Sequence, residues 1–315
     1  MKSIYLVAGL PRSGSTLLMN ILGQNPRFYV TSTSGILDIL VQVRNVWDKN
    51  EAFCAMDRKH SETIKRNVLN GILQSYFQHT DKTVCFDKNR IWPEYLEMAS
   101  ALLGGDERIK VIVTVRDLRD VLASFERVFR HTSALSQIPF EMSDLIRSKT
   151  SLGRIELLLD NSQVVGRSYN VIRDAVTRGW RECMHFVEYD QLTKNPKSVL
   201  EGIYDFLGEA AFLHDFENVE QITFEDDFFY GYKDLHVIRQ QVRSQPPQWT
   251  KIYDQPVRNT QVWKDVEKVS QFWRAYLTGD ASAPAADATI SLNKDKSSNI
   301  VKADENRQAD NSVFK

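Results

Sequence analysis

A glycine-containing turn near the start of the chain, GLPRSGST at residues 9–16, has the spacing of a loop that grips phosphate groups. Gly14 lets the backbone come close to an anion, and a helix that begins at Ser15 would present free backbone N–H groups to it. Further donors are the hydroxyl groups of Ser13, Ser15 and Thr16. Nucleoside triphosphatases need a lysine where Ser15 stands, so the turn poses the question of which anion it holds.

Arg12 follows Pro11 inside this turn. A charged side chain is costly in a tight turn unless it has a partner to hold. Arg12 therefore favours an anion site over a turn that is merely rich in glycine.

A second candidate for anion binding is RDLRDVLASF, which follows the β-rich run IKVIVTV. Arg116 would stand at the carboxyl end of that strand, with Ser124 two helical turns further on. Ligands of open parallel sheets bind at the carboxyl ends of strands, so Arg116 and Arg12 should face one crevice. The alternative is a solvated ion-pair cluster that caps a helix, formed by Arg116, Asp117, Arg119 and Asp120.

These residues need elements that bring them together, and the sequence indicates a parallel sheet. Short β-rich runs alternate with longer segments of helical period, which predicts the α/β class, a three-layer sandwich with a central parallel sheet flanked by helices. The predicted strands span residues 3–8, 83–86, 109–115 and 184–188. The predicted helices span residues 15–22, 35–47, 61–79, 93–103, 118–129 and 196–207.

Two segments interrupt this pattern. Residues 131–166 mix helix-like stretches with Ser, Pro and Gly, which suits a lid or pocket wall but equally an ordinary surface excursion. From residue 280 the chain is rich in Ala, Ser, Asp and Asn without a steady apolar period. We predict one domain over residues 1–279 and a disordered tail over residues 280–315.

Composition excludes several classes of protein. Lys and Arg total 40 against 41 Asp and Glu, so no overall field attracts nucleic acid or an anionic membrane. The three cysteines show no CxxC spacing, which argues against zinc and disulfides. No run is long enough for a membrane span or a signal peptide. We expect a cytoplasmic protein without nucleic-acid or membrane partners, and the oligomeric state stays open.

The two turns together resemble a known family. PRSGST and VRDLRDVLAS are similar to the 5′-phosphosulfate loop and the 3′-phosphate motif of sulfotransferases that use 3′-phosphoadenosine-5′-phosphosulfate (PAPS). The likeness is nearest to the tyrosylprotein and carbohydrate branch, where an arginine replaces the loop lysine of the cytosolic enzymes. It continues through Trp47 and resumes at FDKNRIW and EYDQLTKNPKSVLEGIYDFLG. It implies a P-loop-like sulfotransferase fold and metal-free, in-line transfer of a sulfuryl group from PAPS to a hydroxyl or amine.

The resemblance also implies roles for individual residues. Arg12 and Lys88 would be catalytic, because they would stabilise negative charge on the oxygen that links sulfur to the 5′-phosphate. Tyr189 would touch the adenosine, and Arg239 or Arg243 would supply a late phosphate contact. The full set of implied PAPS contacts is Pro11, Arg12, Ser13, Gly14, Ser15, Thr16, Arg116, Ser124, Tyr189 and Arg243. Without the resemblance, Lys88 would be interpreted as a surface lysine at a strand end.

One expected group is missing. Where the tyrosylprotein enzymes carry a glutamate pair as the base that takes the acceptor's proton, this chain has Ser32 and Thr33. The candidates for a replacement are Asp38, Asp87 and any of the six histidines, of which His60, His79 and His131 lie in segments expected to wall the acceptor pocket. Asp87 should point to the opposite face of its strand from Lys88.

The acceptor stays open between a small molecule, a glycan and a peptide. The stretch FEDDFFYGY at residues 224–232 would either line a pocket for a phenol or form a buried aromatic cluster. Two other functions also stay open at this point, a P-loop nucleotide kinase and a nucleotide-binding protein without turnover.

Overall fold

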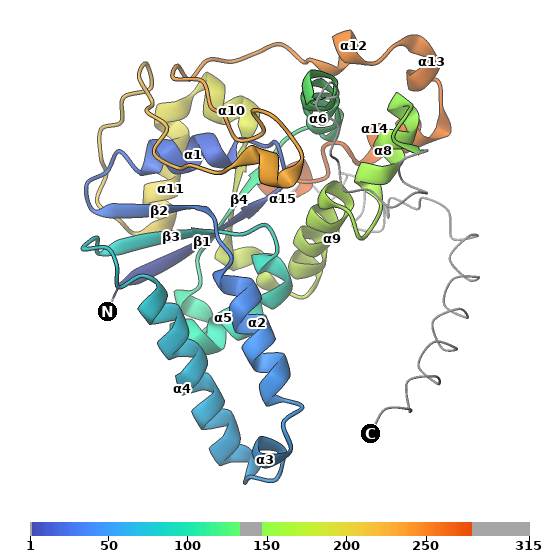
Figure 1. Cartoon of the computed structure of the whole chain (residues 1–315). Coiled ribbons are helices and arrows are strands. Elements are labelled where there is room, and N and C mark those ends of the chain that lie inside the picture. The colour runs from blue at the N-terminus through green and yellow to red at the C-terminus, as the bar shows by residue number, and fades with distance from the viewer. Residues whose placement is uncertain (1, 133–146, 279–315) are drawn as a thin grey trace, which may run out of the picture.

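The computed structural model describes residues 2–132 and 147–278. Within this part of the chain, five parallel strands form one sheet in the order β2-β3-β1-β4-β5 (Figure 1). The strands are β1 (Ser3–Gly9), β2 (Phe28–Thr33), β3 (Val84–Lys88), β4 (Val111–Val115) and β5 (Met184–Glu188). Val7 of β1 pairs with Lys88, and Gly9 pairs with Thr114. The carboxyl ends of three central strands therefore meet at one edge.

Helices follow the strands, as the alternating pattern predicts. The α-helices are α1 (Ser15–Leu22), α2 (Ile36–Trp47), α3 (Glu51–Cys54), α4 (Arg58–Tyr76), α5 (Leu96–Leu103), α6 (Leu118–Thr132), α8 (Ser151–Leu159), α9 (Val164–Thr177), α10 (Tyr189–Lys194), α11 (Pro196–Leu207), α12 (Trp249–Ile252), α13 (Gln255–Arg258), α14 (Gln261–Val269) and α15 (Arg274–Thr278). Short 3-10 helices are η1 (Trp92–Tyr95), η2 (Asp106–Arg108), η4 (Trp180–Cys183) and η5 (Asp227–Tyr230).

Helices cover both faces of the sheet, so the side chains that alternate between the two faces of each strand are buried on either side. Leu6 and Ala8 pack into a core shared with α2, α5, α6, α9 and α14. Tyr5 and Val7 pack on the opposite face, into a core shared with α1 and α11. The predicted three-layer α/β sandwich is confirmed (Figure 1).

The prediction of four strands was wrong, because it missed β2. This strand ends in Thr31, Ser32 and Thr33, and it pairs only with β3 at the edge of the sheet, with an irregular register after Val30. An edge strand of mixed polarity lacks the continuous apolar run that marks a central parallel strand. The strand β3 also ends two residues later than predicted, so Lys88 is its last residue.

The helices α2 and α4 pack on the sheet at one end and extend beyond it at the other (Figure 1). Figure 1 shows α2 and α4 projecting from it as a pair, with α3 at the far end. The segment at residues 131–166 contains α8, while residues 133–146 and the predicted tail at 280–315 lie outside the described residues. None of the described helices is long and apolar enough to cross a membrane.

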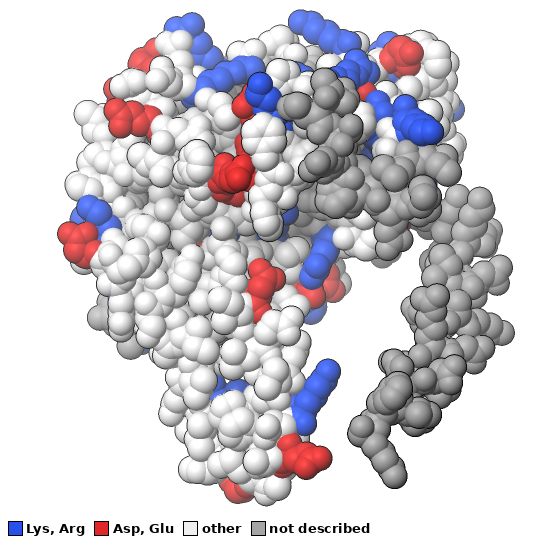
Figure 2. All heavy atoms as spheres, viewed as in Figure 1, with Lys and Arg blue, Asp and Glu red and all other residues white. Residues whose placement is uncertain are grey.

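Charged side chains of both signs are interspersed on the face of the molecule shown in Figure 2. Basic side chains are most frequent in the upper part of this view, and acidic ones lie among them. This mixture agrees with the formal net charge of −1. Attraction of an anion must therefore come from a local arrangement of side chains.

Candidate active site

A cavity of about 460 Å³ lies at the carboxyl edge of the sheet. Both predicted anion-binding turns and the end of β3 contribute to its wall. The sequence-predicted residues that line it are Pro11, Arg12, Gly14, Ser15, Thr16, Lys88, Arg116, Ser124, Tyr189 and Arg243. Every residue predicted to contact the nucleotide therefore borders this one cavity except Ser13.

Two glycines shape the first turn. A Cβ atom on Gly9, which has φ +145°, would lie 2.2 Å from the backbone oxygen of Thr114. Gly14 has φ +87° and immediately precedes α1, and a Cβ atom there would lie 2.5 Å from Cδ2 of Tyr189. Side chains larger than hydrogen are excluded at both positions, so the turn packs against β4 on one side and Tyr189 on the other.

The Ser13 hydroxyl does not face the cavity, contrary to the expectation that it would donate to an anion. Ser13 is fully buried. Its Oγ donates to the backbone oxygen of Leu10, and it lies 2.7 Å from Oγ1 of Thr114. The hydroxyl ties the turn to β4 and is not available to a ligand. Only the backbone N–H of Ser13 is therefore still predicted to contact a nucleotide.

Arg12 sits at the centre of the cationic side of the cavity. Its Nε donates to Oγ of Ser124 at 3.0 Å, which links the two predicted turns directly. Its backbone has φ 58°, a left-handed conformation that is uncommon outside glycine. Burial, together with Arg127 and Arg116 nearby, lowers the pKa of Arg12 to about 10. A bound anion would relieve this repulsion.

Arg116 leaves a buried donor free for a ligand. Its Nη1 donates to the backbone oxygen of Arg12 at 3.3 Å, and its guanidinium lies 4.3 Å from the centre of the Tyr189 ring. Its Nε is buried and has no hydrogen-bond partner among the residues that the structure describes. A buried donor without a partner costs about 1–3 kcal/mol, so this position favours an acceptor atom supplied by a ligand.

The ion-pair cluster expected as the alternative forms without Arg116. Asp117 holds Arg119 through contacts of 3.0 and 2.7 Å, and it also accepts from the backbone N–H of Arg119. Asp120 accepts from the backbone N–H of Gln248 at 2.7 Å. Of the expected cluster, only Asp117 and Arg119 form an ion pair, while Asp120 is buried against backbone N–H groups and Arg116 lines the cavity.

Lys88 reaches the cavity from the end of β3, as its position in the sequence indicated. It is 6 % exposed, and its Nζ lies 3.4 Å from Oγ1 of Thr16 and 3.0 Å from Oε1 of Glu225. Burial lowers the pKa of Lys88, and the charge of Glu225 partly offsets this effect. Asp87 points to the opposite face of the strand, where it accepts from Nε1 of Trp92 at 2.7 Å.

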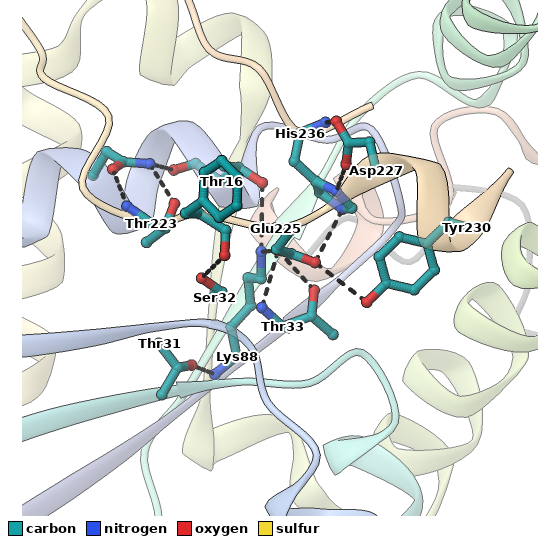
Figure 3. A network of polar contacts seen from close by, with 12 residues as sticks. Thr16, Thr31, Ser32, Thr33, Lys88, Thr223, Glu225, Asp227, Tyr230 and His236 are labelled. Atoms are coloured by element: carbon teal, nitrogen blue, oxygen red, sulfur yellow. Dashed lines mark hydrogen bonds and ion pairs between the residues drawn. The ribbon is translucent and has the colours of Figure 1, made fainter. Parts of the chain in front are cut away.

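Glu225 is a residue that the sequence reasoning missed. Its Oε1 accepts from the backbone N–H and the hydroxyl of Thr33, each at 3.0 Å, and the Ser32 hydroxyl donates to the backbone oxygen of Phe224 at 2.8 Å (Figure 3). Burial would raise the pKa of Glu225, but Lys88, His236 and the Thr33 hydroxyl together lower it. A carboxylate therefore lies beside positions 32 and 33, contributed from far along the chain. The acidic stretch FEDDFFYGY was the available signal.

The other carboxylates and histidines considered as bases lie elsewhere. Asp38, His60, His79 and His131 are exposed and do not line the cavity. His79 contacts the backbone oxygen of Tyr76, and His131 lies 3.4 Å from Asp234.

Part of the cavity wall is apolar, although the elements that form it also contribute Glu126, Arg127 and Arg154 to the lining. It contains side chains from α6, α8, α9 and the later loops, namely Phe125, Phe129, Leu157, Leu158, Val164, Tyr230, Tyr232 and Leu235. Within the segment at residues 131–166, α8 and the start of α9 therefore form a pocket wall. The stretch FEDDFFYGY is no buried aromatic cluster, because Tyr230 and Tyr232 line the cavity while Phe224, Phe228 and Phe229 are exposed.

The late phosphate contact keeps two candidates. Arg239 and Arg243 both line the cavity. The side chain of Arg243 is 67 % exposed, and its Nη2 lies 3.9 Å from Oε2 of Glu217.

A model of the sulfotransferase family matches residues 5–212, more than half of the chain. The chain belongs to the sulfotransferase family. The matched region of this sulfotransferase contains both predicted anion-binding turns, Lys88 and Tyr189, and sulfuryl transfer is its activity. Neither the nucleotide kinase nor the binding protein without turnover is favoured by this match. The match supports the family but not its tyrosylprotein and carbohydrate branch.

Several solved structures resemble the sulfotransferase at low identity. A sulfotransferase domain from the curacin biosynthetic pathway is 18 % identical with a TM-score of 0.46, over 91 % of this chain and 94 % of that one. A mouse sulfotransferase complexed with PAP is 14 % identical with a TM-score of 0.47, over 85 % and 88 %. Retinol dehydratase in complex with androsterone and inactive cofactor PAP is 15 % identical with a TM-score of 0.45, over 89 % and 82 %. No curated protein matches the chain.

Proposed function

We propose that the enzyme transfers a sulfuryl group from PAPS to a hydroxyl or amine of a small acceptor molecule. One observation carries the proposal. Arg12, Arg116 and Lys88 converge on one cavity, and the buried Nε of Arg116 has no hydrogen-bond partner among the described residues. PAPS carries anionic groups at two separate positions, which suits two cationic turns.

The donor would lie across the two turns. The 5′-phosphosulfate would bind at residues 11–16, where the start of α1 offers free backbone N–H groups. The 3′-phosphate would contact Arg116 and Ser124, and the adenosine would pack on Tyr189. Arg243 would contact a phosphate from the loop that follows α11. PAP, the product that remains, would keep all these contacts except those to the sulfuryl group.

The transfer step needs charge stabilisation more than covalent help from the protein. The acceptor oxygen or nitrogen forms a bond to sulfur, while the bond from sulfur to the bridging oxygen of the 5′-phosphate breaks and leaves its electron pair on that oxygen. Lys88 and Arg12 would stabilise this developing charge. The sulfuryl group carries less negative charge than a terminal phosphate, which is why we propose a metal-free step.

The wall of the cavity supports an acceptor with an apolar body. Phe129, Leu157, Leu158 and Leu235 offer contact to such a body, and Tyr230 and Tyr232 add aromatic surface. A glycan would present mostly hydroxyl groups to this wall. A small phenol or alcohol is therefore our preferred acceptor. A cytoplasmic location and a domain that ends at residue 279 stay predictions.

Calorimetric titration with PAP tests the donor assignment. Arg12→Ala and Arg116→Ala each remove a charge-assisted contact worth about 1.5–3 kcal/mol, so Kd should rise by roughly 10- to 150-fold. Arg27→Ala is the matched control, because Arg27 is half-exposed and paired with Glu209, away from the cavity. If neither cavity variant binds PAP more weakly than the control, the assignment of the nucleotide site is wrong.

A further inference from the structure

The proposed transfer needs a group that takes the proton of the acceptor, and positions 32 and 33 hold only hydroxyl side chains. We propose that His236 is this base, positioned by Asp227 and Glu225. The inference rests on the proposed function and adds a catalytic residue to it. Each of these residues lies in the loop after β5 and α11, beyond the part of the chain that carries the family match.

Location is the first support. The chain contains six histidines, and among the described residues His236 alone borders the cavity that also holds Lys88 and Arg12. The His236 side chain is 16 % exposed. An acceptor in the cavity can therefore reach the imidazole, while bulk water has limited access to it.

Asp227 fixes the orientation and the tautomer of the ring. Its Oδ1 lies 2.6 Å from Nδ1 of His236, and its Oδ2 accepts from the backbone N–H of His236 at 2.9 Å (Figure 3). A carboxylate can only accept, so Nδ1 carries the proton of the neutral ring. The other nitrogen, Nε2, then has a free lone pair and can act as a base.

Glu225 connects this base to Lys88. The Nε2 atom of His236 lies 3.7 Å from Oε2 of Glu225, and the other carboxylate oxygen of Glu225 contacts Nζ of Lys88 at 3.0 Å (Figure 3). Two carboxylates and one ammonium give this group a charge of −1, so a proton on His236 brings it to neutrality. The proposed base, His236, and the lysine that would stabilise charge on the leaving oxygen, Lys88, therefore both lie beside the carboxylate of Glu225.

The loop that carries the base is held firmly. Gly231, which has φ +73°, directly follows the 3-10 helix η5, and the backbone N–H of Tyr232 donates to the backbone oxygen of Asp227 at 3.1 Å. The backbone N–H of Lys233 donates to Oγ1 of Thr132 at 3.1 Å. The ring of His236 thus projects from a loop tied to α6, which limits its displacement during the reaction.

The protonation state also suits a base. Burial lowers the pKa of His236 below its ordinary value, against the opposing effects of Glu225 and Asp227, and Lys88 adds to the lowering. These three groups and the ring of Tyr230, 5.8 Å away, surround the imidazole. A lowered pKa favours the neutral ring, which is the form that can accept a proton.

A proton passes from the acceptor hydroxyl to Nε2 of His236 as the acceptor oxygen bonds to sulfur. The bond between sulfur and the bridging oxygen breaks, and its electron pair stays on PAP. The imidazolium then lies between Asp227 and Glu225 until it returns its proton to water.

The kinetic test compares His236→Gln with His60→Gln, an exposed histidine on α4. With PAPS and 2-naphthol, a phenol with an apolar body, His236→Gln should lower kcat by about 10²- to 10⁴-fold and leave the Kd for PAP within about threefold. The acidic limb of the kcat/KM profile should vanish. The proposal is wrong if His236→Gln leaves kcat unchanged. It is also wrong if the acidic limb of the kcat/KM profile disappears in Glu225→Gln but remains in His236→Gln.

A second test needs no acceptor. Nitrogen-15 NMR of the histidine rings in the folded protein at pH 7 should show His236 neutral with its proton on Nδ1, and Asp227→Asn should disturb this tautomer. A doubly protonated ring, or a proton on Nε2, would overturn the proposal whether or not 2-naphthol is a substrate. Failure of PAP to bind the wild type would instead refute the proposed function, so the two failures are distinguishable.

Discussion

At the scale of single residues, the buried ion pair of Lys88 and Glu225 should contribute measurably to the stability of the protein. Both side chains are 7 % exposed and lie 3.0 Å apart. Burial penalises each charge, and each partner offsets the penalty of the other. Removal of one member leaves a buried charge without its partner, which costs about 3–5 kcal/mol in such sites.

We therefore expect Lys88→Met to lower the free energy of unfolding by several kcal/mol. The double variant Lys88→Met, Glu225→Gln should recover a large part of this loss, because its remaining amide can still accept from Thr33. Denaturant unfolding of the wild type, both single variants and the double variant closes the cycle. Additive losses would show that the two charges do not stabilise each other.

A histidine outside the cavity should govern part of the response to acid. Burial lowers the pKa of His214 from 6.5 to about 4, and its ring contacts Tyr204 and Gln24. Below pH 6.5 His214 takes up a proton in the unfolded chain but not in the folded protein, and this favours unfolding. The stability that the neutral, buried His214 allows is therefore fully present above pH 6.5. It is lost as the pH falls from 6.5 toward 4, by about 1.4 kcal/mol per unit at most.

The measurement is the free energy of unfolding at pH 7, 6 and 5 for the wild type and His214→Gln. The variant should show a shallower fall over this range. Equal slopes for both proteins would mean that His214 takes up its proton as easily when folded as when unfolded.

At the scale of elements, two glycines within helices should respond oppositely to the same substitution. Gly71 lies in α4, and a Cβ atom there would meet nothing within 4 Å. Gly71→Ala should raise the free energy of unfolding by about 0.5–1 kcal/mol, because alanine restricts the unfolded chain and favours the helix. Gly166 lies in α9, where a Cβ atom would fall 2.3 Å from the backbone oxygens of Leu159 and Asp160.

Gly166→Ala should therefore destabilise the protein, since backbone atoms cannot move aside cheaply. Thermal unfolding of the two variants side by side gives the comparison. A stabilised Gly166→Ala would show that the turn between α8 and α9 is looser than the structure has it.

Elements with strong local signals were predictable, and those set by distant partners were not. The strand β5 and the helices α1 and α11 have the bounds predicted from apolar period and capping residues. The strand β2 was missed because its pairing with β3, rather than its own composition, makes it a strand. The remaining residues of the site lie in loops and could not be predicted from the sequence. His236 lines the cavity and Glu225 contacts Lys88 only because residues 223–243 fold back toward the carboxyl edge of the sheet, which no local pattern indicates.

At the scale of the whole molecule, the fold extends beyond the region that matches the family. The match ends at residue 212, yet Trp263 and Trp273 are fully buried in the core that contains α6. Each large apolar side chain contributes about 1.5–3 kcal/mol when buried, against a total stability of about 5–15 kcal/mol.

A chain cut after residue 212 should therefore fail to unfold cooperatively, whereas a chain cut after residue 279 should keep the wild-type melting temperature and affinity for PAP. Differential scanning calorimetry and PAP titration of the two truncations check this expectation. A cooperative transition in the shorter chain would place the end of the folding unit at the family boundary.

Asn20 of α1 links the first predicted anion-binding turn to the loop that carries His236. Its amide nitrogen donates to Oγ1 of Thr223 at 2.8 Å, and its amide oxygen accepts from the backbone N–H groups of Ile222 and Thr223. The same amide nitrogen donates to the backbone oxygen of Thr16, in the turn that would hold the donor. A nucleotide that steadies this turn should also steady the loop that carries His236. Because such coupling is reciprocal, donor and acceptor should each raise the affinity of the enzyme for the other.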